Sequence, residues 1–175
     1  MKNIIKHFIT ITKHRTLVMK LCFKMGIYKQ GLLHDLSKYS FVEFFTSAKY
    51  YAGVHSPTIS ERKDKGYSDI WMHHKGRNKH HYEYWFDFSY AENKYVAIKI
   101  PINYVKEMVC DRIAASKVYL KDQYTSSSAL EYFNRTYDKN EMHPETRDLL
   151  KSWLELVSEK GEYEAIKIIK KVKNY

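Results

Sequence analysis

Two stretches of the chain have apolar residues at helical spacing with an ionisable side chain on the same face. In residues 3–25 the apolar positions recur up to Gly26, and His14 lies among them. From Pro101 to about Lys121 the spacing returns, with Asp111 on the apolar side. Burying an unpaired carboxylate is costly, so Asp111 needs a cation or several hydrogen bonds. The chain must therefore fold so that partners reach these two side chains.

Taken alone, each of the two side chains has a plainer explanation. A histidine on an apolar helix face is more often a hydrogen-bonded core residue than a ligand. An ion pair with Arg112 or Lys117 would neutralise Asp111, although residues at those offsets point to other parts of a helix. A site is indicated only if other segments converge on the same place.

A third segment, from Gly31 to Lys38, sets a histidine beside an aspartate after two leucines. We expect a helix to begin at residues 30–36 and to carry His34 and Asp35. Adjacent residues on a helix point about 100° apart, so this pair can reach one ion only where the helix ends or bends.

Four histidines lie within nine positions, as two pairs seven residues apart: His73, His74, His80 and His81. Gly76 and Asn78 lie between the pairs and suggest two short helices joined by a turn. A histidine-rich surface tract that scavenges metal is the alternative interpretation.

The remaining segments predict mainly helices. Ser37 or Ser40 can cap a helix to Tyr51, and Glu43 lies three residues after Ser40 as in a capping box. Residues 53–68 contain proline, glycine and mixed charges, and predict a flexible loop or lid. Residues 93–100 fit a strand or a loop.

Towards the C-terminus, residues 126–128 can cap a helix to about Lys139, and Pro144 is well placed in the first turn of the next. Gly161 separates that helix from a last amphipathic, basic one, Tyr163 to Val172.

The length favours one domain over residues 1–175, and the helical patterns along it favour an all-α bundle. No apolar run approaches the roughly 20 residues that span a bilayer, so we expect no membrane partner. With only Cys22 and Cys110, a disulfide framework is not indicated, which favours the cytoplasm. The formal net charge of +10 favours an anionic partner. Nucleic acid is compatible with it but not favoured, because no nucleic-acid motif accompanies the charge.

Imidazoles and carboxylates from separate helices together suit a divalent ion such as Mn, Fe, Co, Ni or Zn. The predicted ligands of one ion are His14, His34, Asp35 and Asp111. The segment from His73 to His81 could complete the shell of a second ion. Two ions roughly 3.5–4 Å apart would activate a water and stabilise charge on a phosphoryl oxygen.

The order of His14, His34-Asp35 and Asp111 resembles that in the HD-domain superfamily of metal-dependent phosphohydrolases. The run from His34 to Lys38 is similar to the His-Asp-x-x-Lys form of HD-GYP phosphodiesterases, in which extra histidines bind a second metal. The Gly-Tyr-Pro element of those enzymes is missing here, so the resemblance does not imply specificity for cyclic di-GMP.

A closer resemblance is to an uncharacterised family of small bacterial and phage proteins, and it covers most of the chain. Its members have segments similar to residues 34–38, 74–85 and 108–111 of this sequence. A phage member would work in the cytoplasm of its host. This resemblance sharpens the predicted HD-like fold but supplies no substrate.

The HD resemblance implies hydrolysis of a phosphate mono- or diester, with a small nucleotide or nucleotide-derived substrate. Asp35 would bridge to a second ion bound by two of His74, His80 and His81. Lys38, Arg77 and Lys75 would neutralise phosphate oxygens. His74 or His81, if not a ligand, would protonate the leaving oxygen. Two alternatives stay open: an HD-like di-iron enzyme that activates dioxygen, and a non-catalytic metal-containing protein that binds a partner through its basic surface.

Overall fold

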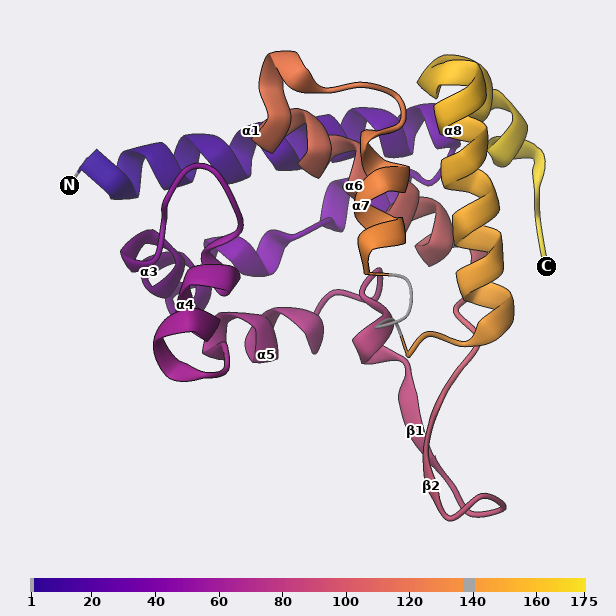
Figure 1. Ribbon diagram of the computed structural model, residues 1–175, viewed down its shortest axis with the longest axis horizontal. Helices are drawn as coiled ribbons and strands as arrows, with labels where there is room; N and C mark the ends of the chain where they lie inside the picture. The colour runs from indigo at the N-terminus through magenta and orange to yellow at the C-terminus, as the bar shows by residue number, and fades with distance from the viewer. Residues whose placement is uncertain (1, 137–140) are drawn as a thin grey trace.

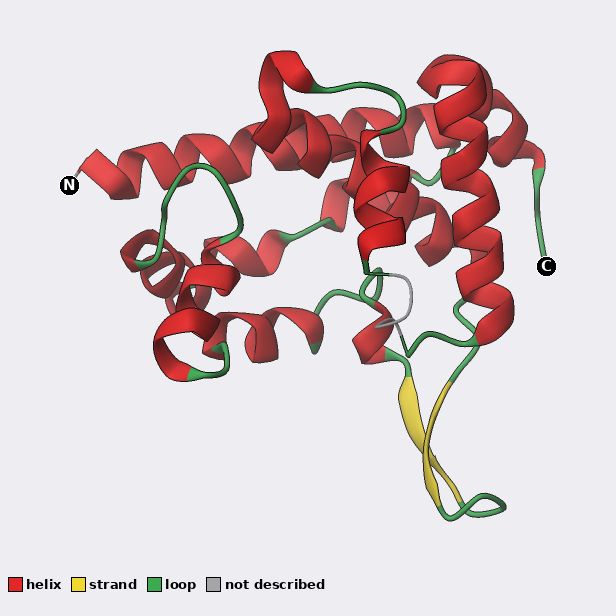
Figure 2. Ribbon diagram, viewed as in Figure 1, coloured by secondary structure: helices red, strands yellow, loops and turns green. Residues whose placement is uncertain are grey.

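The computed structural model of the protein describes residues 2–136 and 141–175, and helices dominate them (Figures 1 and 2). The α-helices are α1 (Lys2–Met25), α2 (Tyr28–Leu33), α3 (Phe41–Lys49), α4 (Pro57–Lys65), α5 (Asp69–Lys75), α6 (Ile102–Leu120), α7 (Ser128–Arg135) and α8 (Pro144–Lys171). The 3-10 helices within these residues are η1 (Leu36–Tyr39), η2 (Tyr82–Tyr84) and η3 (Lys121–Gln123). An antiparallel hairpin of β1 (Phe86–Ser89) and β2 (Lys94–Ala97) projects from the helices. The predicted all-α class is confirmed.

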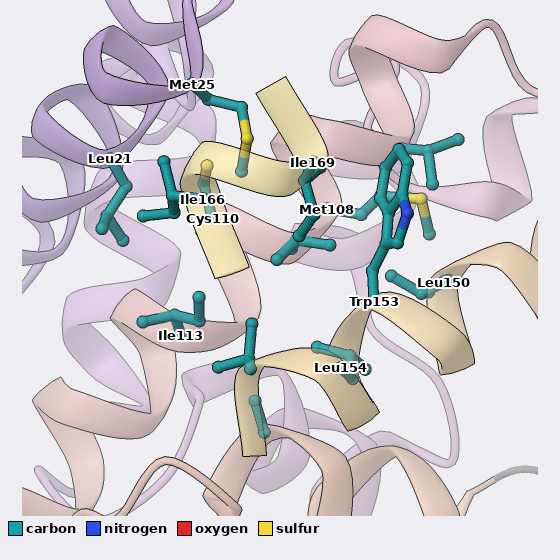
Figure 3. Packing of buried hydrophobic residues seen from close by; sticks show 14 of the residues in the cluster. Leu21, Met25, Met108, Cys110, Ile113, Leu150, Trp153, Leu154, Ile166 and Ile169 are labelled. Atoms are coloured by element: carbon teal, nitrogen blue, oxygen red, sulfur yellow. The ribbon is translucent and has the colours of Figure 1, made fainter. Parts of the chain in front are cut away.

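The apolar core lies where α1, α6 and α8 meet. The C-terminal half of α1 packs against α6, and α8 packs against both helices. Val18 of α1, Met108 and Ile113 of α6, and Leu150 and Ile169 of α8 are all buried in one cluster. Figure 3 shows side chains of these three helices meeting in that core. Each helix presents one apolar face, so three of them can enclose a common interior.

Gly31 fixes where α2 lies against α1. A Cβ at this position would lie only 2.9 Å from the Cβ of Cys22 and 3.2 Å from the ring of Phe23. Glycine is the residue that permits such a close approach. Because α2 is short, this contact also fixes the place where it ends, beside the middle of α1.

Residues 57–65 form α4, so the loop predicted for residues 53–68 is wrong over that part. Glu61 of α4 is completely buried. Its carboxylate accepts hydrogen bonds from the hydroxyl of Ser68 (2.6 Å) and the backbone amide of Ile70 (3.2 Å), and it pairs with Lys65 (3.0 Å). The two hydrogen bonds join α4 to the start of α5. They connect residues seven and nine positions apart, so a local sequence pattern does not predict them.

The other helix boundaries agree with the sequence in part. The hydroxyl of Ser40 accepts from the amide of Glu43 at the start of α3, as predicted, but α3 ends at Lys49. Helix α7 ends at Arg135, and Lys139 lies outside the described residues. The predicted break at Gly161 is present inside α8, with φ 73° and ψ 164°. None of the described helices is long and apolar enough to cross a membrane.

His7 is a buried titratable residue on the inner face of α1. Among the described residues, neither of its ring nitrogens has a hydrogen-bond partner. The imidazole packs against the rings of Phe44 and Tyr51, both with centroids 5.5 Å away. Burial, aided by the positive charge of Lys38, lowers the pKa of His7 to about 4. The ring is therefore neutral in the folded protein at neutral pH.

We expect His7 to make the folded protein sensitive to acid. Its pKa is lower in the folded chain than in the unfolded chain, so its contribution is present above pH 6.5 and lost as the pH falls towards 4. Between pH 7.5 and 5 this loss amounts to about 2 kcal/mol. His7→Phe should remove that part of the pH dependence, measured by urea unfolding at both pH values. An unchanged difference between the two pH values in the variant would contradict this account.

Candidate metal centre

His34 and Asp35 lie where α2 ends. The helix stops at Leu33, His34 leaves it with φ −50° and ψ 125°, and Asp35 takes the left-handed conformation with φ 53° and ψ 25°. Aspartate is one of the few residues that adopt this conformation readily. The turn brings Nε2 of His34 to 3.3 Å from Oδ2 of Asp35. The predicted helix therefore ends before the pair and does not carry it. His34 and Asp35 lie just after the end of α2, where adjacent side chains can reach one ion.

A first group of polar side chains forms between α1, the end of α2, and α6. Nε2 of His14 lies 3.0 Å from Oδ1 of Asp111 and 3.6 Å from Oδ2 of Asp35. Nε2 of His34 lies 3.6 Å from the same oxygen of Asp111. One nitrogen or oxygen atom from each of the four residues lies within 4.8 Å of the others. The structure therefore brings together the four residues predicted to hold one ion.

A second group forms around the other oxygen of Asp35. Nε2 of His74, at the end of α5, lies 3.3 Å from Oδ1 of Asp35, and Nε2 of His80 lies 3.6 Å from it. Together with His81, these residues again place four donor atoms within 4.8 Å of one another. Asp35 thus presents one oxygen to each group. This is the arrangement expected of a bridging carboxylate.

Two buried glutamates contact the Nδ1 atoms of the histidines, on the side of each ring away from Asp35. Oε1 of Glu107 lies 2.8 Å from Nδ1 of His34 and 3.1 Å from Nδ1 of His80, one histidine from each group. Oε2 of Glu43 lies 3.0 Å from Nδ1 of His74. A carboxylate that accepts the Nδ1 proton leaves Nε2 free to bind, and this is how metal-binding histidines are commonly oriented. His34, His80 and Glu107 also lie close enough to one another to bind an ion. We interpret these contacts instead as hydrogen bonds by which Glu107 orients the two histidines.

Neither glutamate is among the site residues that the sequence predicts. Glu107 lies one helical turn before Asp111, and this spacing is the signal that could have found it. Glu43 is expected only as part of the cap of α3. A further contact missed by the sequence comes from Asn78, whose amide donates to the hydroxyl of Ser37 at 2.8 Å and links the two segments.

Several buried polar atoms of the second group test whether a cation would fit. Oδ1 of Asp35 and Nε2 of His80 and of His81 are buried, and none has a hydrogen-bond partner within residues 2–136 and 141–175. Leaving such an atom unsatisfied costs roughly 1–3 kcal/mol. All three belong to one group of donors, so a single cation would satisfy them together. Imidazole nitrogen and carboxylate oxygen are suitable ligands for a divalent transition ion.

The charges of the first group reinforce one another. Burial opposes protonation of His34, but Asp35, Asp111 and Glu107 outweigh it and raise the pKa of His34 well above 6.5. Burial also opposes ionisation of Asp35, yet His34 and Lys38 hold its pKa well below the usual range. Nζ of Lys38 lies 2.6 Å from Oδ2 of Asp35. Asp35 is thus a buried, ionised carboxylate whose charge is stabilised by the cationic groups beside it.

The pKa of His81 is shifted in the opposite direction from that of His34. Burial lowers its pKa well below 6.5, and the neighbouring His80 and His74 lower it further. A neutral imidazole is the form that binds metal. His81 is therefore in a binding form at neutral pH.

The two predicted phosphate-binding cations have different environments. Lys38 lies at the first group through its contact with Asp35, with 31% of its side chain exposed. Arg77 is exposed, and Nη1 donates to the backbone oxygen of His73 at 3.1 Å. The role of Arg77 in neutralising a phosphate stays a prediction.

We expect the protein to bind two divalent ions, and the two aspartates to affect them unequally. Asp111→Asn changes a ligand of the first group only and should leave one ion bound. Asp35→Asn changes the shared ligand, keeps a side chain that tolerates the left-handed backbone, and should reduce both ions. Metal analysis after equilibration with Mn or Zn and dialysis measures this, with Asp122→Asn, an exposed residue of η3, as the control. Wild-type metal content in Asp35→Asn would contradict the shared role.

Glu107→Gln should weaken metal binding at both groups, because one oxygen of Glu107 supports a histidine of each. Changing such a supporting carboxylate typically costs 10–100-fold in affinity. Competition with a chelator measures the two affinities. A loss at one group alone would show that the two histidines do not depend on the same carboxylate.

Comparison with protein families shows which family the chain belongs to. Residues 3–156, most of its length, match the model of DUF5662, which is described as a family of unknown function. No curated protein and no solved structure matches the chain. The histidines and aspartates of both groups lie within the matched residues. The chain belongs to DUF5662, a family of unknown function.

Proposed function

We propose that the protein is a metal-dependent phosphohydrolase that cleaves a phosphate mono- or diester of a nucleotide or a nucleotide-derived compound. The observation that carries this proposal is the shared carboxylate of Asp35, which offers one oxygen to each of two adjacent donor groups. Lys38, a cation beside the same carboxylate, adds support. The resemblance of the His14, His34-Asp35 and Asp111 order to HD-domain enzymes agrees with it.

In this proposal, His14, His34, Asp35 and Asp111 hold one ion, and Asp35, His74, His80 and His81 hold another. When bound, such a pair of ions supplies Lewis acidity to an attacking water and to a phosphoryl oxygen. Glu107 and Glu43 contact Nδ1 of His34 and of His74, so Nε2 would be the atom available to an ion. His74 and His81 act as ligands here, not as proton donors to the leaving oxygen.

Substrate would approach from the side of Lys38 and Asp111. The side chains of His34 and Asp35 are at most 1% exposed, whereas those of Asp111 and Lys38 are 18% and 31% exposed. Burial opposes protonation of Lys38, but Asp35 and Asp111 outweigh it and raise its pKa above the usual value. The ammonium therefore stays charged at neutral pH, where it can bind a phosphate oxygen.

A di-iron enzyme that activates dioxygen is the second candidate. The two groups contain five histidines and only two aspartates, and imidazole suits iron as well as other transition ions. This candidate differs from the first in its chemistry but uses the same ligands.

We expect metal-loaded protein to hydrolyse at least one substrate in a screen of mononucleotides, cyclic nucleotides and aryl phosphates with Mn, Co, Zn and Fe. Lys38→Ala should keep its metal and lose roughly 100-fold in kcat/KM, because removal of one charge-stabilising group typically costs that much. Lys20→Ala, an exposed lysine of α1, is the matched control. Absence of turnover in fully loaded protein would refute the hydrolase. An iron absorption band that changes with oxygen would then favour the second candidate.

A further inference from the structure

An exposed apolar surface covers the end of the molecule where the N-terminal half of α1 lies near η1 and α3. Contacts between rings connect its aromatic residues. Phe8 packs on Tyr39 and Phe44, with centroids 6.1 and 6.3 Å away, Phe44 packs on Phe45 at 5.4 Å, and Phe45 packs on Phe41 at 4.7 Å. We call these five residues, together with Ile5 and Ile9 of α1, the apolar face.

Most of the apolar face is open to solvent. Phe41 is 79% exposed, Ile5 61% and Ile9 58%. Ile5 and Ile9 lie one turn apart on the side of α1 opposite to its buried residues, such as Ile11 and Val18. Contiguous apolar patches of this kind are rare on proteins that stay free in solution, and they mark binding surfaces.

A row of lysines runs beside the apolar face. Four exposed residues of α1 have spacings of four, seven and seven: Lys2, Lys6, Lys13 and Lys20. At 100° per residue they fall within about 40° of one another around the helix, next to Ile5 and Ile9. They form one basic stripe along the outer side of α1.

No exposed acidic residue balances this stripe in the elements that form the face. The sequence has no aspartate or glutamate before Asp35. Neither η1 nor α3 contains an acidic residue other than Glu43, which is 1% exposed and paired with His73 and with His74 of the second group. The partner of this face must therefore be apolar and anionic at once.

We propose that the apolar face binds the surface of an anionic membrane. A helix with lysines along one side and isoleucine and phenylalanine beside them can lie in a bilayer interface, with its apolar side chains at the acyl boundary. Each lysine near an anionic leaflet adds attraction. The contact is peripheral, so it needs no spanning helix. The sequence-based expectation of no membrane partner rests only on the lack of a span.

The same charges disfavour a second copy of the chain as the occupant. Two copies joined through this face would bring their lysine stripes near one another, and like charges across an interface are costly. An anionic lipid surface neutralises the stripe instead. This proposal does not depend on the hydrolase proposed above.

Sedimentation with vesicles tests the proposal. We expect the full chain to bind vesicles of phosphatidylglycerol and phosphatidylcholine at least tenfold more tightly than vesicles of phosphatidylcholine alone. Lys6→Glu/Lys13→Glu should weaken binding to the anionic vesicles by at least about 30-fold, since each lost lysine removes about 1 kcal/mol of attraction and each glutamate adds repulsion. Ile5→Ser/Ile9→Ser should weaken it at least tenfold, and Phe41→Ser should also weaken it. All of these side chains are exposed, so the changes spare the core.

The controls change an exposed aromatic residue and an exposed lysine that lie outside the apolar face and the lysine stripe. Tyr90→Ser lies on the hairpin, where Tyr90 is 92% exposed, and Lys160→Glu lies on α8, far from α3 in Figure 1. Both should bind as the wild type does. Three results would overturn the proposal: no binding to anionic vesicles, binding that depends on the lysines but not on Ile5 and Ile9, or light scattering that shows a dimer dissociated by Ile5→Ser/Ile9→Ser without any vesicle binding.

Discussion

A buried, ionised carboxylate with positive or protonatable groups on both sides is the interaction around which this molecule is built. Removing a carboxylate from water costs several kcal/mol unless partners surround it. Asp35 has Lys38, His34 and His14 at one oxygen, and His74 and His80 at the other. Those partners come from α1, the end of α2, η1, and the α5 region. The helices are therefore arranged around a charged centre as much as around an apolar one.

The long helix α1 joins three environments that differ in chemistry. Its C-terminal half supplies Val18 and Cys22 to the core with α6 and α8. Its middle supplies His14 to the charged centre. Its N-terminal half carries Ile5 and Ile9 at the surface. Since one rigid helix runs through all three, the distances between core, site and surface are set by helix geometry.

The sequence predicts well those features that break a local pattern. His14 and Asp111 stand out because they interrupt apolar helix faces, and the His34-Asp35 pair because adjacent side chains converge only at a helix end. The same reasoning misses Glu107 and Glu43. Glutamate in a helix is usually a surface residue, and only the burial that follows from packing makes these two distinctive.

The sequence does not predict helix α4, for a related reason. Its residues are mostly polar, so neither apolar spacing nor propensity marks it strongly. Its order depends on Glu61, whose partners Ser68 and Ile70 lie after the helix. Such contacts exist only once the chain has folded. Arg77 shows the opposite case, in which the sequence pattern suggests more than the structure supports. A basic residue between two histidine pairs suggests a role in the site, but its exposed position does not by itself support that role.

The left-handed backbone at Asp35 restricts how this site can change during evolution. Side chains other than asparagine, aspartate and glycine are strained at a φ of 53°, whatever their chemistry. A relative that keeps this turn but has abandoned the charged centre should therefore carry asparagine or glycine at the equivalent of Asp35. The backbone thus gives a way to distinguish lineages that retain the site from those in which it has decayed.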